Sequence, residues 1–228
     1  YEQGMPVAIN LPFVTNQMPA YVAGKIVFTG PNLNKPGTTY LDEVKVEFLQ
    51  DGSGLQAAIN QAAWQGRLDL TPGSCYHMTN TLFLPGHFVL NGNGATLRMA
   101  PFTQLSVLAN NDWNAGNQNL VVSNLVIDGN EFDQAVNPQN NGATRYAAVD
   151  ASQVDNVGAY FKNTTGLLVS DVTFKNIPNE AMLLLASQAA TVINCVFTNC
   201  ALLSISNNLT QCALYTRWTT GSFFLNNR

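Results

Sequence analysis

The acidic stretch between residues 128 and 155 holds the residue types that could do chemistry. Glycoside hydrolysis needs two carboxylates facing each other across the scissile bond, ~5 Å apart in retaining enzymes and ~6.5 to 9.5 Å apart in inverting ones. Asp128, Asp150 and Asp155 are therefore the candidate catalytic residues. The alternatives are a solvated loop, which naturally collects charge, and a set of calcium ligands.

Other side chains in and around this stretch could hold a carbohydrate without reacting with it. The apolar face of a sugar stacks on an exposed aromatic ring, and charged groups bind its polar substituents. Trp113 lies in the polar segment Asn-Asn-Asp-Trp-Asn, so we expect its ring either to be exposed for binding or to clamp its own loop. The candidate binding residues are Trp113, Glu131, Asp133, Arg145, Tyr146 and Lys175.

Three segments of the chain repeat one pattern, and they are the elements that would position these side chains. Residues 120–130, 167–177 and 190–200 align without a gap. The second and third copies start 23 residues apart, and the first and second start 47 apart, which is either two turns of the period or one turn with a long insertion. A fixed period of this size is typical of a solenoid, whose coils stack ~4.8 Å apart.

Equivalent positions of the copies predict which side chains point inward. Apolar and polar residues alternate after a bend at Asn124, Asp171 and Asn194, which favours two short strands joined at a corner over a helix. Asn176 and Asn199 are one coil apart and predict a ladder of side-chain amides. The predicted inward columns are Val122, Val169 and Val192; Leu125, Val172 and Cys195; and Ile127, Phe174 and Phe197.

Lys175 occupies the position of Asp128 in the repeat, one or two coils away. A polysaccharide lyase uses a base, often Lys or Arg, beside a substrate carboxylate that calcium or Arg neutralises. An ordinary ion pair on the face of a sheet is the other interpretation. Calcium is therefore the one cofactor that the sequence leaves open, and no residue is assigned to a metal site.

The chain divides into a lead-in segment and a repetitive region. Residues 1–50 lack the period, contain two predicted strands and are expected to form an attachment or oligomer contact. Residues 51–228 form the solenoid. Its last part, residues 210–228, fits the columns poorly and predicts an irregular cap or a cut chain.

One short amphipathic helix is predicted at the start of the solenoid. Ser53-Gly-Leu-Gln56 offers a capping box, apolar residues then recur on one helical face, and Gly66 supplies a stop. The pattern predicts a helix over about residues 54–65. Because the end of a solenoid exposes unpaired strand edges, we expect this helix to cover that end.

Short strands separated by Pro-Gly and Asn-Gly turns follow the helix. The segments Pro72-Gly-Ser-Cys-Tyr76, Thr81-Leu-Phe-Leu-Pro85 and Leu90-Asn-Gly-Asn-Gly-Ala-Thr96 resemble the opening of right-handed parallel β-helix proteins of the pectate-lyase-like superfamily. That superfamily includes polysaccharide lyases, polygalacturonases, alginate epimerases and phage tailspikes. Over about residues 51–228 the resemblance implies an all-β fold, a right-handed single-stranded parallel β-helix with three sheets and an N-terminal capping α-helix. The polygalacturonase motifs Asn-Thr-Asp, Asp-Asp, Gly-His-Gly and Arg-x-Lys are absent, which argues against that branch.

Composition excludes several classes of protein. A net charge of -4, with 11% charged residues and no Lys/Arg cluster, argues against nucleic-acid binding. No apolar run approaches the ~20 residues that span a bilayer, so no membrane span is predicted. The cysteines lack metal-site spacing; a bridge between Cys200 and Cys212 is one option, and buried thiols are the other.

Two functions remain open from the sequence. The first is a tailspike-like module that is extracellular, at the cell surface or on a virion, and that binds a polysaccharide or cell-surface glycan or partner subunits. It is expected to be a homo-oligomer, a trimer being one option. The second is a polysaccharide hydrolase or lyase that uses the acidic region 128–155. The short stack and the missing motifs favour the first, and they also fit a fragment of a longer β-helix.

Overall fold

The computed structural model describes residues 49–51, 53–101, 103, 105–131, 134, 156–200 and 213–228. The chain divides into two compact units, residues 1–45 and 46–228. The strands predicted within residues 1–48 lie outside the described residues. No helix in the described part of the chain has both the length and the apolar character that crossing a membrane would take.

The described residues are mostly β-structure and contain one helix, α1 (Ser53–Ala62). All their strand pairs are parallel, and they form a nine-stranded sheet, here sheet A, and a five-stranded sheet, sheet B. Sheet A contains β1 (Leu49–Asp51), β2 (Arg67–Asp69), β3 (Cys75–Met78), β5 (Val89–Met99), β7 (Val121–Asp128), β9 (Leu168–Ile177), β11 (Thr191–Ile193), β12 (Val196–Cys200) and β14 (Phe223–Leu225). Sheet B contains β4 (Leu82–Leu84), β6 (Leu108–Asn110), β8 (Ala159–Lys162), β10 (Met182–Leu185) and β13 (Leu214–Arg217).

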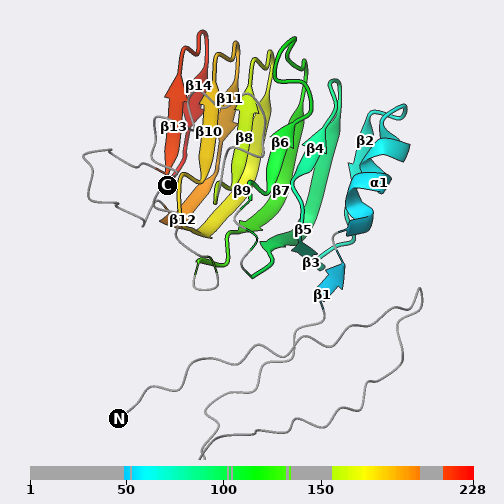
Figure 1. Cartoon of the computed structure of the whole chain (residues 1–228). Helices are drawn as coiled ribbons and strands as arrows, with labels where there is room; N and C mark the ends of the chain where they lie inside the picture. Colours follow the sequence, from blue (N-terminus) through cyan, green and yellow to red (C-terminus); the bar gives the residue numbers. More distant parts are fainter. Residues whose placement is uncertain are drawn as a thin grey trace, which may run out of the picture. The chain divides into compact units, whose positions relative to one another are not determined.

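From β3 to β11 the chain visits sheet A and sheet B in turn; β12 is again in sheet A, and β13 and β14 return to sheets B and A. From β5 onward each strand lies beside a strand of the preceding coil (Figure 1). Strands β5, β7 and β9 are direct neighbours in sheet A, while β6 and β8 are neighbours in sheet B. Since β7 pairs directly with β9, the 47-residue spacing is one turn that carries an insertion, and not two turns.

The predicted inward columns are confirmed by the strand register. Val122 pairs with Val169, and Val169 pairs with Val192. In the next columns Leu125 pairs with Val172, Ile127 with Phe174, and Phe174 with Phe197. The column members from β7, β9 and β11 are at most 2% exposed, so they form the core between the sheets.

The bends also occur where the sequence predicts them. Asn124, Asp171 and Asn194 have φ values of 51°, 55° and 56°, in the left-handed region that Asn and Asp tolerate better than other non-glycine residues. Strands β2 and β3 pair with different halves of β5, as β11 and β12 do with β9. The pairing skips the residues at the bends, while β5, β7 and β9 each continue past the bend as one strand, so the described strands make up two sheets.

The predicted amide ladder is present near the C-terminal ends of β9 and β12. Asn199 Nδ2 donates to Asn176 Oδ1 at 3.3 Å, and Asn176 Nδ2 donates to Asp128 Oδ1 at the same distance. Asn130, Asn176 and Asn199 all have φ near 50°. Each amide therefore ties one left-handed turn to the turn of the preceding coil.

Helix α1 covers the N-terminal end of the stack, beside β4 (Figure 1). Leu55, Ile59 and Ala62 are buried in the core. The helix ends earlier than the sequence predicts, because the backbone N–H groups of Gln65 and Gly66 turn back to the Ala62 carbonyl, with Gly66 at φ 72°.

Gln56 does not serve the predicted capping box. Its Oε1 accepts from the Phe83 backbone N–H at 2.8 Å, and its Nε2 donates to the Phe83 carbonyl at 3.1 Å. The side-chain amide therefore occupies the place that a neighbouring strand would have on the free edge of β4, which is the end strand of sheet B.

The other end of the stack differs from the sequence prediction. Residues 213–228 continue the ladder, with β13 in register beside β10 and β14 beside β11. The expectation that residues 210–228 form an irregular cap is therefore wrong for the described part. The exposed large apolar side chains at this end are Trp218, Phe223, Phe224 and Leu225.

Among the described residues, Cys75, Cys195 and Cys200 form no disulfide with one another. The Cys200 thiol donates to the carbonyls of Phe174 and Thr198, and burial raises its pKa to about 11. Cys212 lies outside the described residues, so the optional bridge from Cys200 to Cys212 stays a prediction. Burial also raises the pKa of Cys195, which fills its apolar column as predicted.

Replacing Gln56 with Ala should expose the edge of β4. We expect Gln56→Ala to lower the free energy of unfolding by about 1 to 3 kcal/mol, because two part-buried hydrogen bonds on the edge of β4 are lost. Gln61→Ala, an exposed glutamine of the same helix, is the matched control and should change stability by less than about 0.5 kcal/mol. Equal effects in urea denaturation would contradict the edge-pairing role.

The inward columns can be tested at Phe174, which is fully buried and stacked on Phe197 with ring centroids 5.2 Å apart. Phe174→Ala should cost about 3 to 5 kcal/mol, because a large cavity replaces packed atoms. Phe223→Ala removes the same atoms from a side chain that is 60% exposed, so it should cost far less. Denaturant midpoints that do not separate the two variants would refute the predicted core.

Candidate functional site

One column of outward side chains on sheet A brings charged residues together. The buried neighbours of each strand point into the core, so alternate residues point outward. The strand register places His77 beside Arg98, Arg98 beside Asp128, and Asp128 beside Lys175. We call Arg98, Asp128 and Lys175 the charged column; His77 precedes it by one coil, and Thr198 extends it by one coil.

Asp128 is the most tightly held residue of the charged column and is only 6% exposed. Its Oδ1 accepts from the Asn130 backbone N–H at 3.0 Å and from Asn176 Nδ2. Its Oδ2 lies 3.4 Å from Lys175 Nζ, and the Lys175 side chain is 40% exposed. The ion pair that the sequence offered as an interpretation is therefore confirmed, and it presents an ammonium group at the surface.

Gly129 and Asn130 complete the turn beside Asp128. A Cβ atom at Gly129 would lie 2.6 Å from the Asn176 carbonyl oxygen, so only glycine lets the two coils approach here. Asn130 Oδ1 accepts from Arg98 Nη2 at 3.0 Å. Asn130 therefore connects Arg98 to Asp128, and the carboxylate lies between a cation on the preceding coil and a cation on the next.

Glu131 follows this turn and is partly buried, and this burial raises the pKa of its carboxyl group. Gln134 connects the chain after Glu131 to the residue that follows β5, because its Nε2 donates to the Ala100 carbonyl at 2.8 Å. Glu131 follows Asp128 by three residues in the sequence. The other predicted residues of this region, Asp133, Arg145, Tyr146, Asp150 and Asp155, lie outside the described residues, and their roles stay predictions.

Trp113 corrects one expectation. Its side chain is only 6% exposed, so its ring faces are not available to stack on a sugar. The ring packs edge to face against Tyr160, with centroids 4.3 Å apart, and Lys162 Nζ lies 5.8 Å from its centroid. Asn163 Nδ2 donates to the Trp113 carbonyl at 2.7 Å. The ring contacts are therefore with β8 of the next coil, and the alternative that Trp113 clamps its own loop stays a prediction.

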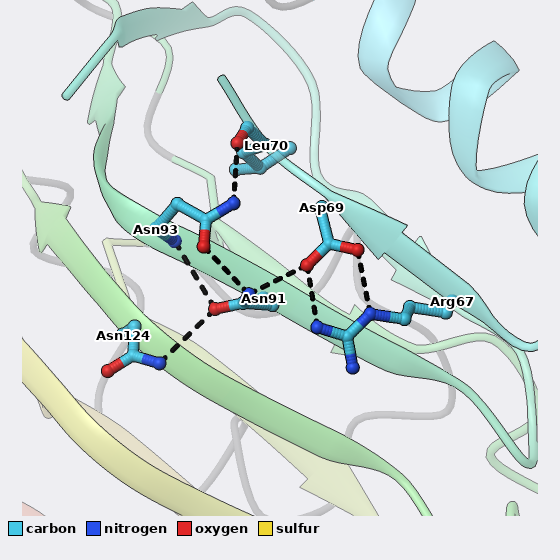
Figure 2. A network of polar contacts seen from close by, with 6 residues as sticks. All are labelled: Arg67, Asp69, Leu70, Asn91, Asn93 and Asn124. Carbon is cyan, nitrogen blue, oxygen red and sulfur yellow. Dashed lines mark hydrogen bonds and ion pairs between the residues drawn. The ribbon is translucent and has the colours of Figure 1, made fainter. Parts of the chain in front are cut away.

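A polar network joins β2, β5 and β7 at the bends of β5 and β7 (Figure 2). The sequence does not predict this network. Arg67 binds Asp69 through two hydrogen bonds of 2.7 Å, from Nε to Oδ2 and from Nη2 to Oδ1. Asn91 Nδ2 donates to Asp69 Oδ1 at 2.7 Å, and Asn124 Nδ2 donates to Asn91 Oδ1 at 3.2 Å. Asn93 joins the network and donates to the Leu70 carbonyl.

The row of side-chain hydrogen bonds at the bends continues along the stack. Asn194 Nδ2 donates to Asp171 Oδ1 at 3.3 Å, and Asn226 Nδ2 donates to Asn194 Oδ1 at 3.5 Å. The signal for this row was the Asn or Asp at the bend of each repeat. These hydrogen bonds satisfy polar groups at the left-handed turns, so we assign the row a structural role. Among the described residues, no group of three or more His, Cys, Asp and Glu side chains is placed to hold a metal ion.

No protein-family model matches this chain, and no curated protein matches its sequence. Solved structures do match its fold. A protein described as a "putative glycosyl hydrolase" from Parabacteroides merdae has a TM-score of 0.55 at 15% identity, over 78% of this chain and 91% of that one. At this identity the likeness concerns the fold alone.

Two structures of PfbA, a surface adhesin of Streptococcus pneumoniae, match as well. They have TM-scores of 0.51 and 0.52 at 18% identity, over 70% and 74% of this chain. The match covers only 38% and 43% of the adhesin chains, so this chain is similar to less than half of each. The shared feature is again the fold.

The Arg67–Asp69 pair makes a testable electrostatic prediction. Hydrogen bonds from Arg67, and then from Asn91, lower the pKa of Asp69 from 3.8 to about 2. Because the folded-state pKa is depressed, the stabilising contribution is present above pH 3.8 and is lost as the pH falls toward 2. An NMR titration of the Asp69 carboxyl carbon should have its midpoint near 2, and Arg67→Gln should move it up. Arg228→Gln, at the far end of the stack, should leave it in place; a normal Asp69 midpoint in the unaltered protein would contradict the pair.

Proposed function

We propose that this chain is a glycan-binding surface module that holds a polysaccharide or cell-surface glycan along the outward side of sheet A. The observation that carries the proposal is the charged column, in which Arg98, Asp128 and Lys175 lie in register on successive coils. Charged groups at a regular spacing along a flat sheet suit an extended chain ligand with regularly spaced polar substituents. The fold likeness to a surface adhesin and to a "putative glycosyl hydrolase" supports a surface and carbohydrate-related role.

The finer architecture belongs to the same proposal. We infer a right-handed parallel β-helix with three faces, namely the two stretches of sheet A on either side of the bends, and sheet B. The positive φ values at the bends and the separate partners of each stretch support three faces. The proposed location is extracellular, at the cell surface or on a virion, as in a tailspike-like protein.

We further propose that copies of this chain assemble into a homo-oligomer, for which a trimer is one arrangement. The exposed apolar side chains on β14, Phe223, Phe224 and Leu225, support an additional contact at that end of the stack.

A polysaccharide hydrolase or lyase is the second candidate function. The raised pKa of Glu131 favours it, because a general acid must keep its proton at the working pH. Asp128 would be the second carboxylate, with Asp150 and Asp155 as the other predicted partners. Lys175 Nζ lies 3.4 Å from Asp128 Oδ2, so a substrate would have to displace this contact before Lys175 could act as the base of a lyase.

A panel of acidic and neutral polysaccharides separates the two functions. We expect binding with no change in chain length and no unsaturated ends. Cleavage that disappears in Glu131→Gln or Asp128→Asn would establish the enzyme instead. Failure of every glycan to bind or to be cleaved would refute the proposed function.

The face that binds can be tested with a steric block. Thr198 is exposed on β12 and follows Lys175 in the register, so Thr198→Trp should reduce glycan binding by about tenfold or more. Thr216→Trp makes the same change at an exposed position of β13 in sheet B and is the matched control. Equal affinities of the two variants would place the glycan elsewhere.

A further inference from the structure

We propose that the charged column recognises an acidic glycan in which charged and uncharged sugar residues alternate. This inference rests on the proposed function, and it adds the substrate class. It follows from the signs and the spacing of three side chains, Arg98, Asp128 and Lys175.

The two cations of the column are two coils apart. Asp128 is the direct neighbour of both Arg98 and Lys175 in the register, and each coil advances the stack by ~4.8 Å, so the cations repeat at ~10 Å. An extended sugar residue advances a glycan by about the rise of one coil. An anionic substituent on every second sugar therefore meets a cation each time, whether it is a carboxylate or a sulfate.

Asp128 selects against the other arrangement. A polymer with an acid on every sugar would bring an anion opposite Asp128, where like charges a few Å apart repel. Asp128 cannot turn away, because Asn130 and Asn176 hold one of its oxygens and Lys175 holds the other. An uncharged sugar opposite Asp128 avoids this repulsion.

The cations are held differently, and both are positioned by the fold. Lys175 is partly exposed and anchored by Asp128, so its ammonium group is presented at the surface. Arg98 Nη2 donates to Asn130 Oδ1, which orients the guanidinium group. The local formal charge of the three side chains is positive, although the whole chain carries -4.

Three hexasaccharides of equal length test the proposal by calorimetry at low salt. They are alternating glucuronate and N-acetylglucosamine, galacturonate throughout, and neutral cellohexaose. We expect the alternating chain to bind best. Lys175→Gln and Arg98→Gln should each weaken its binding by about tenfold, the usual effect of losing one charge-assisted contact. Asp128→Asn should raise the affinity for the galacturonate chain and so reduce the difference in affinity between it and the alternating chain.

Arg67→Gln is the matched control, because it removes one positive charge from sheet A at a distant bend and should leave binding unchanged. Far-UV circular dichroism checks that each variant is folded. If Arg98→Gln is not folded, Lys175→Gln, at a partly exposed position, carries the test. Tighter binding of galacturonate or cellohexaose, or equal effects of Arg67→Gln and Lys175→Gln, overturns the inference and leaves the proposed function standing. Failure of the panel in both this assay and the polysaccharide screen refutes both.

Discussion

The structure depends on one constraint, the in-register parallel pairing of each coil with the coil before it. Backbone hydrogen bonds set the distance between coils, so equivalent side chains fall into columns whether they point inward or outward. A slip of one residue in β9 can put Ser170 and Lys175 in the inward positions of Val169 and Phe174. The burial of these columns therefore fixes the register, and the register in turn fixes every outward column, including the charged one.

The same pairing creates a cost at each bend and each end. At the bends the backbone adopts left-handed φ values, and the Asn and Asp side chains there donate to or accept from their counterparts on the adjacent coil. At the N-terminal end α1 covers the core, and the Gln56 amide pairs with the free edge of β4. At the other end, the apolar side chains of β14 are exposed. The N-terminal end of the described stack is thus closed by a helix and by a side-chain amide.

The sequence predicts those features that repeat. The inward columns, the bends, the amide ladder and the Asp128–Lys175 pair each follow from comparing equivalent positions of the three copies. It does not predict what occurs once. Trp113 lies in a polar segment without periodicity, and its burial depends on Tyr160, 47 residues later. Gln56 matches a capping box, but the free edge of β4 competes for its amide. Residues 213–228 were missed because the spacing from β11 to β14 is 32 residues in place of 23, although Asn194 and Asn226 occupy equivalent turns.

The charged column shows how the fold constrains what its surface can bind. On a parallel stack, outward residues in one column are separated by a single coil rise, and like charges at that separation repel. Alternating signs avoid the repulsion, and Arg98, Asp128 and Lys175 follow that order. Side chains of one sign are then separated by two coil rises, with the opposite sign held between them. Electrostatic stability of the sheet thus sets the repeat at which the surface can offer cations, and a chain-like ligand must match that repeat to use more than one of them.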